Sequence, residues 1–94
     1  MTKAEIIAEI SNKTGLEKVD VQETVEAFFK VVKNAMISGE NVYVRGFGSF
    51  VVKKRAEKTA RNISKNTAII IPAHYVPSFK PAKVFVEKVK QGNK

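Results

Sequence analysis

The sequence predicts an α+β fold, with two helices first, an antiparallel sheet next and a third helix at the C-terminus. Three observations lead to it. Apolar residues recur every three or four positions up to about residue 38, and β-branched and aromatic residues then alternate around closely spaced glycines. After these come a long basic polar stretch and a proline-flanked amphipathic segment. The 94 residues suffice for one domain with a modest core, for which a partner subunit often supplies further cover.

The first helix is expected from residue 2 to about residue 13. Thr2 followed by Glu5 is typical of a capping box, and the isoleucines between positions 6 and 10 share one helical face. Gly15 should end it.

The second helix is predicted over residues 18–38, with Gly39 as its stop. It carries a wide apolar stripe, which consists of Val21, Val25, Phe28, Phe29, Val32 and Met36. One short neighbouring helix cannot cover such a stripe. Packing against a second copy of the chain explains it better than a cofactor pocket does.

Two strands are predicted around Gly46-Phe47-Gly48, where glycine permits a tight turn and the close approach of another backbone. The Gly-x-Gly spacing lacks the remaining residues of a phosphate loop, so nucleotide binding is not favoured. Strict alternation places four side chains on one face of the second strand and Phe50 and Val52 on the other. The four are Ser49, Val51, Lys53 and Arg55.

A long basic arm should follow. Between positions 53 and 66 the only acid is Glu57, and Ser64-Lys65-Asn66 suits a turn from which the β-branched run 67–71 returns. Two strands alone are marginally stable in water, so a ligand should complete the arm. The ten steps from Lys53 to Ile63 span about 33 Å when extended, enough to follow a groove partly around a duplex.

The C-terminal helix is expected to start at Pro81, with Lys83 in its first turn. A cation is unfavourable beside the positive end of the helix dipole. A phosphate partner would account for that lysine.

Charge is concentrated in the second half of the chain. Residues 1–47 hold six Lys/Arg against seven Asp/Glu, and residues 48–94 hold eleven against two, which gives −1 and +9 of the net +8. This asymmetry indicates a polyanionic partner, of which nucleic acid is the commonest, although a basic face kept for solubility is the alternative. No cysteine, secretory segment or membrane-length apolar run is present, so a soluble cytoplasmic protein is expected.

No catalytic or metal site is predicted. The single histidine, His74, has no acid or nucleophile partner at a recognisable spacing, and we expect it to be solvated or to face a phosphate. We therefore expect no enzymatic activity, cofactor, metal, membrane or small-molecule substrate.

Four short strings resemble one family in their order and spacing. They are RGFGSF at 45–50, ARN at 60–62, IIIPA at 69–73 and PSFKPAK at 77–83. Together with the flanking helices, they make the chain similar, over almost its whole length, to the HU and integration host factor family of bacterial histone-like DNA-binding proteins.

The resemblance implies an intertwined dimer with a helical dimerisation base, a β-saddle and long protruding two-stranded β-arms. It implies one domain over 1–94, with 1–40 helical, 41–80 forming saddle and arm, the arm at about 53–75, and 81–94 as the C-terminal helix. A homodimer is expected, and a heterodimer with a paralogue stays open. The implied interface residues are Phe28, Phe29, Val32, Phe47, Phe50 and Phe79.

The same resemblance implies a nucleoid protein that condenses and bends DNA through the minor groove, largely without sequence specificity, and prefers bent, nicked or gapped duplexes. The implied DNA-binding residues are Lys3, Gly46, Gly48, Lys53, Arg55, Lys58, Arg61, Asn62, Ile63, Lys65, Lys80 and Lys83. Two other functions remain open from the residues alone. One is a basic RNA-binding or assembly protein, and the other is a purely structural oligomerisation module.

The chain departs from the family pattern at the arm tip. Ile63 stands where proline is usual, and Asn66 and Ala82 replace usual glycines. An apolar side chain on a basic arm can act as a wedge between base pairs, so Ile63 is a candidate intercalating residue. The alternative is a β-branched residue that only stiffens the tip.

Overall fold

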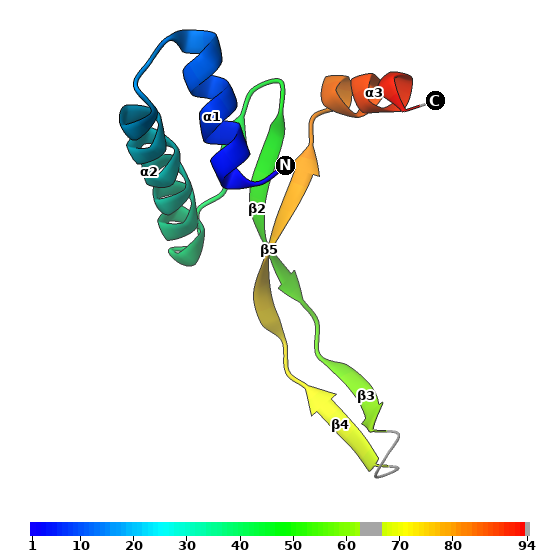
Figure 1. Ribbon diagram of the computed structural model, residues 1–94. Coiled ribbons are helices and arrows are strands. Elements are labelled where there is room, and N and C mark those ends of the chain that lie inside the picture. Colours follow the sequence, from blue (N-terminus) through cyan, green and yellow to red (C-terminus); the bar gives the residue numbers. More distant parts are fainter. Residues whose placement is uncertain (63–66, 94) are drawn as a thin grey trace. The chain divides into compact units, whose positions relative to one another are not determined.

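The computed structural model describes residues 1–62 and 67–93, with the backbone alone at Arg61 and Asn62. The chain divides into two compact units, Met1–Ala35 and Met36–Lys94. Helices α1 and α2 come first, strands β1 to β5 follow, and helix α3 is last (Figure 1). This order confirms the α+β class.

The two predicted N-terminal helices are present as α1, Lys3–Thr14, and α2, Lys18–Ile37. The Thr2 side-chain oxygen accepts a hydrogen bond from the Glu5 amide at 3.2 Å. At the other end of α1, Gly15 has a φ of 75° and its amide donates to the Ser11 carbonyl at 2.9 Å. Both helix-boundary signals in the sequence are therefore confirmed by their hydrogen bonds.

Little apolar surface is buried within the single chain. Among the described residues only Ile7, Val21 and Val32 are buried hydrophobic residues. Phe28 and Phe29 of α2 are 47% and 44% exposed and pack edge to face on each other, with ring centroids 5.5 Å apart. An aromatic pair left in water in this way is unusual for a stable monomer.

The second unit begins with a three-stranded antiparallel sheet in the order β1-β2-β5. Its strands are β1, Val42–Val44, β2, Gly48–Arg55, and β5, His74–Pro81. The predicted hairpin around Gly46 is confirmed by the β1·β2 pairing and by a bond of 3.0 Å from the Phe47 amide to the Val44 carbonyl.

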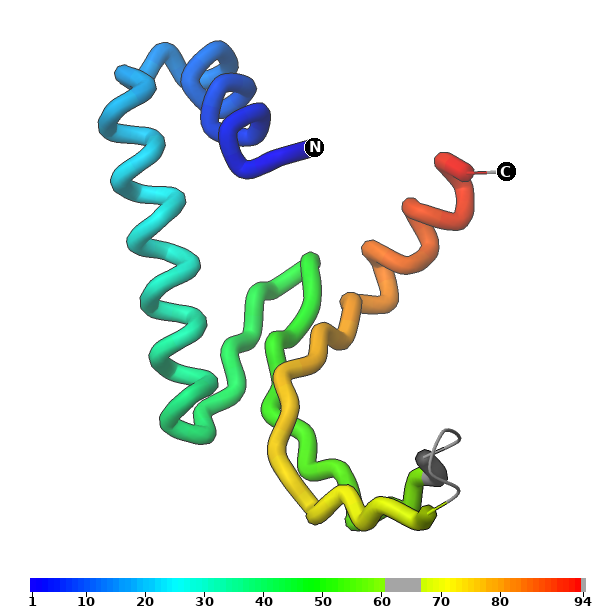
Figure 2. Tube along the Cα trace, turned by 60° about the horizontal axis from the view of Figure 1, so that its bottom comes forward, coloured from blue at the N-terminus to red at the C-terminus, as the bar shows by residue number. Residues whose placement is uncertain are grey.

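Strands β3, Lys58–Asn62, and β4, Thr67–Ile71, form a separate two-stranded ladder. Figure 2 shows these strands continuing the chain beyond β2 and before β5. The sequence predicted a long two-stranded arm without indicating an interruption, and residues 56–57 and 72–73 interrupt it, two on each strand. Pro72 lacks an amide hydrogen, so it cannot donate in a ladder. The register is the same on both sides of this break.

The C-terminal helix α3 runs over Lys83–Gly92, so the predicted start at Pro81 is wrong by two residues. Pro81 is instead the last residue of β5 and pairs with Gly48. The Ala82 amide then donates to the Phe47 carbonyl at 2.9 Å, which holds the backbone extended at this point. Lys83 does lie in the first turn, as predicted.

Aromatic side chains hold the hairpin turn, the sheet and α3 together. The Phe47 ring centroid lies 4.9 Å from that of Phe79 and 5.1 Å from that of Phe85, and Phe50 lies 5.2 Å from Phe79. Gly48 is buried against this cluster. A Cβ atom at Gly48 would lie 2.5 Å from the Lys80 carbonyl oxygen and 2.7 Å from the Phe79 ring. Glycine is thus required by close packing.

We expect Gly48→Ala to lower the free energy of unfolding by about 2 kcal/mol or more, because both the strand and the Phe79 ring must move. Gly92→Ala is the matched control, since a Cβ there meets nothing within 4 Å. Chemical denaturation of both variants measures the difference. Equal stability of the two variants would contradict the packing argument.

Candidate nucleic-acid interface

Three of the predicted DNA-binding cations lie on one face of the β2·β5 ribbon. Residues directly opposite each other in an antiparallel ladder share a face. Lys53 pairs with Val76, Arg55 with His74, and Lys80 with Ser49. Alternation along β2 joins these pairs to the same side. We call this side, with its exposed Lys53, Arg55 and Lys80, the basic face.

The opposite face of the same ribbon is aromatic. Phe50 pairs with Phe79 there, and further along Lys54 pairs with Tyr75. The Lys54 ammonium lies 6.0 Å from the Tyr75 ring centroid, within cation–π range. Neighbouring lysines 53 and 54 are therefore presented on opposite sides.

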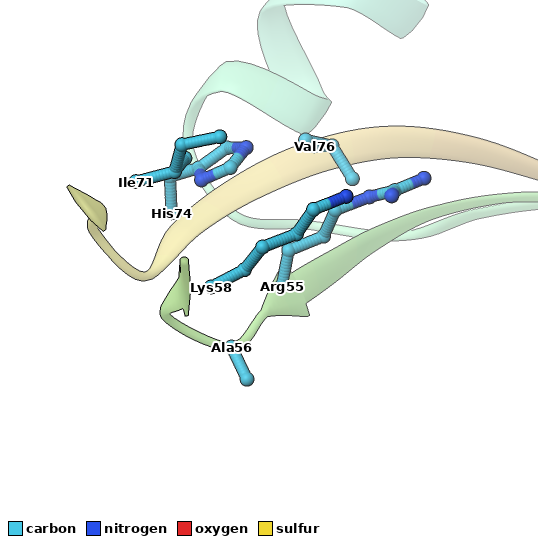
Figure 3. A pocket seen from close by; sticks show the side chains of 6 residues that line it. All are labelled: Arg55, Ala56, Lys58, Ile71, His74 and Val76. Atoms are coloured by element: carbon cyan, nitrogen blue, oxygen red, sulfur yellow. The ribbon is translucent and has the colours of Figure 1, made fainter. Parts of the chain in front are cut away.

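The break in the arm brings a fourth cation to the basic face. Counting by twos from Arg55 would place Lys58 on the other side, but the unpaired residues 56–57 interrupt the alternation. Lys58 instead lines a hollow together with Arg55, and Figure 3 shows their two side chains running beside each other. We include Lys58 in the basic face from here on.

Lys3, predicted to hold a flanking phosphate, is already paired in this structure. Its ammonium lies 3.1 Å from a Glu26 carboxylate oxygen. The hydrogen bond from Lys3, followed by its charge, lowers the pKa of Glu26 from its ordinary value. Both side chains are about half exposed, so solvent screens the pair.

The predicted phosphate-binding glycines are explained by the fold. Gly46 has a φ of 82° in the turn, and Gly48 is closely packed.

Lys83 is the first residue of α3, whose N-terminus has neither a side-chain cap nor an acidic residue in its first turn. That end of α3 keeps its positive potential uncompensated within the protein.

The remaining predicted residues are four at the arm tip and six at the expected dimer interface. The side chains of Arg61 and Asn62 are not described, and Ile63 and Lys65 lie outside the described residues. Among the predicted interface residues, Phe28 and Phe29 are exposed and Val32 is buried within the chain. Phe47, Phe50 and Phe79 form the aromatic cluster with Phe85, which the sequence analysis did not include.

One residue of this surface was missed from the sequence: Tyr43, 73% exposed, pairs with Ser49 and so lies on the basic face. His74, expected to be solvated or to face a phosphate, is exposed and pairs with Arg55 across the ladder. The register between strands places both residues. The constant register of the ribbon could have shown His74 opposite Arg55 if the tip of the arm had been located first.

Other kinds of site are not found in the part of the chain that the structure describes. No three His, Cys, Asp or Glu side chains there come together as a metal site would require. No described helix is both long and apolar enough to cross a membrane.

Comparisons with known proteins find relatives over almost the whole chain. The family model described as "Bacterial DNA-binding protein" matches residues 1–90. The SPbeta prophage-derived DNA-binding protein HU 2 of Bacillus subtilis (strain 168) is 41% identical over 90 residues, covering 96% of this chain and 98% of the relative. Integration host factor subunit alpha of Aliivibrio fischeri (strain MJ11) is 39% identical over 90 residues, covering 96% and 92%.

Among solved structures, the Anabaena HU–DNA cocrystal structure matches with a TM-score of 0.89 and 34% identity, covering 95% of this chain and 97% of that one. The match includes nearly the whole chain on both sides. The family-model match and the sequence identities therefore show that the chain belongs to the bacterial DNA-binding protein family of HU and integration host factor.

Proposed function

We propose that this protein is an architectural DNA-binding protein that binds duplex DNA with its basic face. The observation that carries the proposal is the segregation of Lys53, Arg55 and Lys80 on one side of a ribbon whose other side is aromatic. Such an array neutralises backbone phosphates without reading base edges, so binding is largely independent of sequence. The cocrystal of the Anabaena relative with DNA supports the same assignment.

The arm supplies the finer part of the proposal. A two-stranded ribbon can lie in a minor groove that is widened as the DNA bends, and architectural proteins offset the unstacking energy by wrapping more DNA. We infer preferential binding to bent, nicked or gapped duplexes, because a duplex that is already deformable costs less to bend. A DNA-condensing role in the nucleoid follows from this activity.

The DNA-binding unit is proposed to be a homodimer. The chain alone buries few apolar side chains among the described residues and leaves Phe28 and Phe29 nearly half exposed. A second copy that covers these rings would supply the missing core. Two basic faces in one dimer would also double the number of phosphate contacts.

Gel shifts with an intact duplex, a nicked duplex and a single-stranded RNA of equal length test this function. We expect the nicked duplex to bind most tightly, the intact duplex next and the RNA least. Preferential RNA binding would favour the RNA-binding alternative. No salt-sensitive binding to any probe would leave a structural oligomerisation role.

Ile63 is proposed as the wedge at the arm tip. Ile63→Ala should reduce the bend angle measured by end-to-end fluorescence transfer, because no apolar side chain then separates the base pairs. The salt dependence should stay nearly unchanged, since no charge is removed. Ile63→Pro serves as the control and should bend DNA at least as well as the wild type. Wild-type bending by the alanine variant would mean that Ile63 is not a wedge.

A further inference from the structure

An open hollow of about 400 Å³ lies at the break in the arm, between the two ladders. Strands β2 and β3 contribute its cations, and β4 and β5 contribute its apolar wall (Figure 3). We call it the arm-root hollow. It is lined by Arg55, Ala56, Lys58, Ile71, His74 and Val76.

The lining of the arm-root hollow is cationic and contains no acid. The ion pairs between described residues involve Lys3, Lys13 and Lys90, not Arg55 or Lys58. Glu57, the acid nearest in sequence, is not among the lining residues. Two cations side by side repel each other, and water screens part of this repulsion because Arg55 and Lys58 are both exposed. An anion between the two cations would remove the repulsion.

His74 is oriented by a hydrogen bond at the same break. Its Nδ1 lies 2.9 Å from the Pro72 carbonyl oxygen. Because a carbonyl can only accept, Nδ1 carries the hydrogen and donates it. In the neutral ring Nε2 is then a bare acceptor, and protonation converts Nε2 into a second donor.

We propose that the arm-root hollow binds one backbone phosphate of a DNA duplex, held by Arg55, Lys58 and the protonated imidazole of His74. The inference rests on the proposed function and adds to it a third donor and a proton taken up with the DNA. A phosphodiester oxyanion accepts the charge-assisted hydrogen bonds that all three groups offer. Protonation of His74 and binding of the phosphate favour each other. The negative phosphate stabilises the cationic imidazole beside Arg55 and Lys58, and the cationic imidazole in turn attracts the phosphate.

The direction of the pH effect follows from this chemistry. Imidazole changes its charge between about pH 5 and pH 8, and only the cationic form donates from both nitrogens. DNA affinity should therefore rise as the pH falls. One added ionic contact near 0.1 M salt corresponds to about eightfold in affinity for each hollow that is filled.

Binding isotherms at about pH 8 and about pH 5.5 for three full-length proteins test the proposal. The wild type should bind a labelled duplex about eightfold more tightly per hollow at the lower pH. His74→Gln, always neutral, should lose most of that pH dependence, and His74→Lys, always charged, should bind tightly at both pH values. His74 is the only histidine of the chain, so the comparison isolates one imidazole.

The same pH dependence in His74→Gln, or none in the wild type, would overturn the proposal while DNA binding itself stands. Absence of DNA binding by the wild type at both pH values would instead overturn the proposed function.

Nuclear magnetic resonance of the His74 ring distinguishes a phosphate of duplex DNA from free inorganic phosphate as the bound anion. Shifts on adding duplex, with none from inorganic phosphate at matched ionic strength, support a DNA site. Equal shifts from inorganic phosphate would make it a small-anion site and contradict the proposal.

Discussion

Replacing Lys53, Arg55 and Lys58 together by glutamine should reduce the affinity for duplex DNA by about 1000-fold or more near 0.1 M salt. Lys53 on one phosphate, and Arg55 with Lys58 on another, in each of two subunits correspond to about four neutralised phosphates, and thus to a slope of roughly −4 of log affinity against log salt. The triple variant should lose most of that slope. Fluorescence anisotropy with a labelled duplex over a salt series measures both quantities.

Adjacent lysines provide the control for net charge. Lys53→Gln and Lys54→Gln remove the same charge from neighbouring positions, but only Lys53 lies on the basic face. Lys53→Gln should weaken binding by roughly 50-fold near 0.1 M salt and flatten the salt dependence, because one contact is lost from each of two subunits, whereas Lys54→Gln should change either quantity little. Equal effects would show that overall charge, and not the face, determines binding.

The second large effect concerns the proposed dimer. Phe29→Asp should raise the dissociation constant of the dimer by about 100-fold or more, because an unpaired carboxylate buried at an interface costs about 3 kcal/mol or more. Since the single chain has little core, unfolding of the variant should occur together with dissociation. Thermal unfolding at several protein concentrations, with sedimentation, measures the shift.

Asn34→Asp is the control for that substitution. Asn34 lies on the same helix α2, about half a turn away from the stripe of Phe28, Phe29 and Val32. The Asn34→Asp substitution introduces the same charge at an exposed position and should leave the dimer intact. A Phe29→Asp variant that dissociates and unfolds at the same protein concentrations and temperatures as the wild type would contradict the interface.

Most of the fold could be predicted because local signals determine it. Thr2 and Gly15 mark the ends of α1, and Gly46 with alternating apolar residues marks the hairpin. The start of α3 was missed by two residues, since the pairing of Pro81 with Gly48 joins positions far apart in the sequence. Proline alone permits either a strand end or a first helical turn.

The sequence predicted which cations belong to the candidate DNA-binding surface, but it predicted only in part which side of the ribbon each one occupies. Alternation correctly put Lys53 and Arg55 on one side, because β2 is regular there. Lys58 joined them only because the ribbon is interrupted at residues 56–57. Pro72 on the opposite strand was a local signal for that break, but it did not show which face Lys58 would take. His74 was isolated in the sequence, and its neighbours Arg55 and Lys58 come from other strands.

The central claim is that DNA lies against the basic face, and lysine acetylation footprinting tests it most directly. The protein is acetylated with and without a saturating duplex, and each lysine is quantified by fragment-resolved mass spectrometry. Lys53, Lys58 and Lys80 should be protected by DNA, while Lys54 on the aromatic side stays reactive. Protection of Lys54 with continued reactivity of Lys53 and Lys80 would place the DNA on the other side of the ribbon and contradict the account.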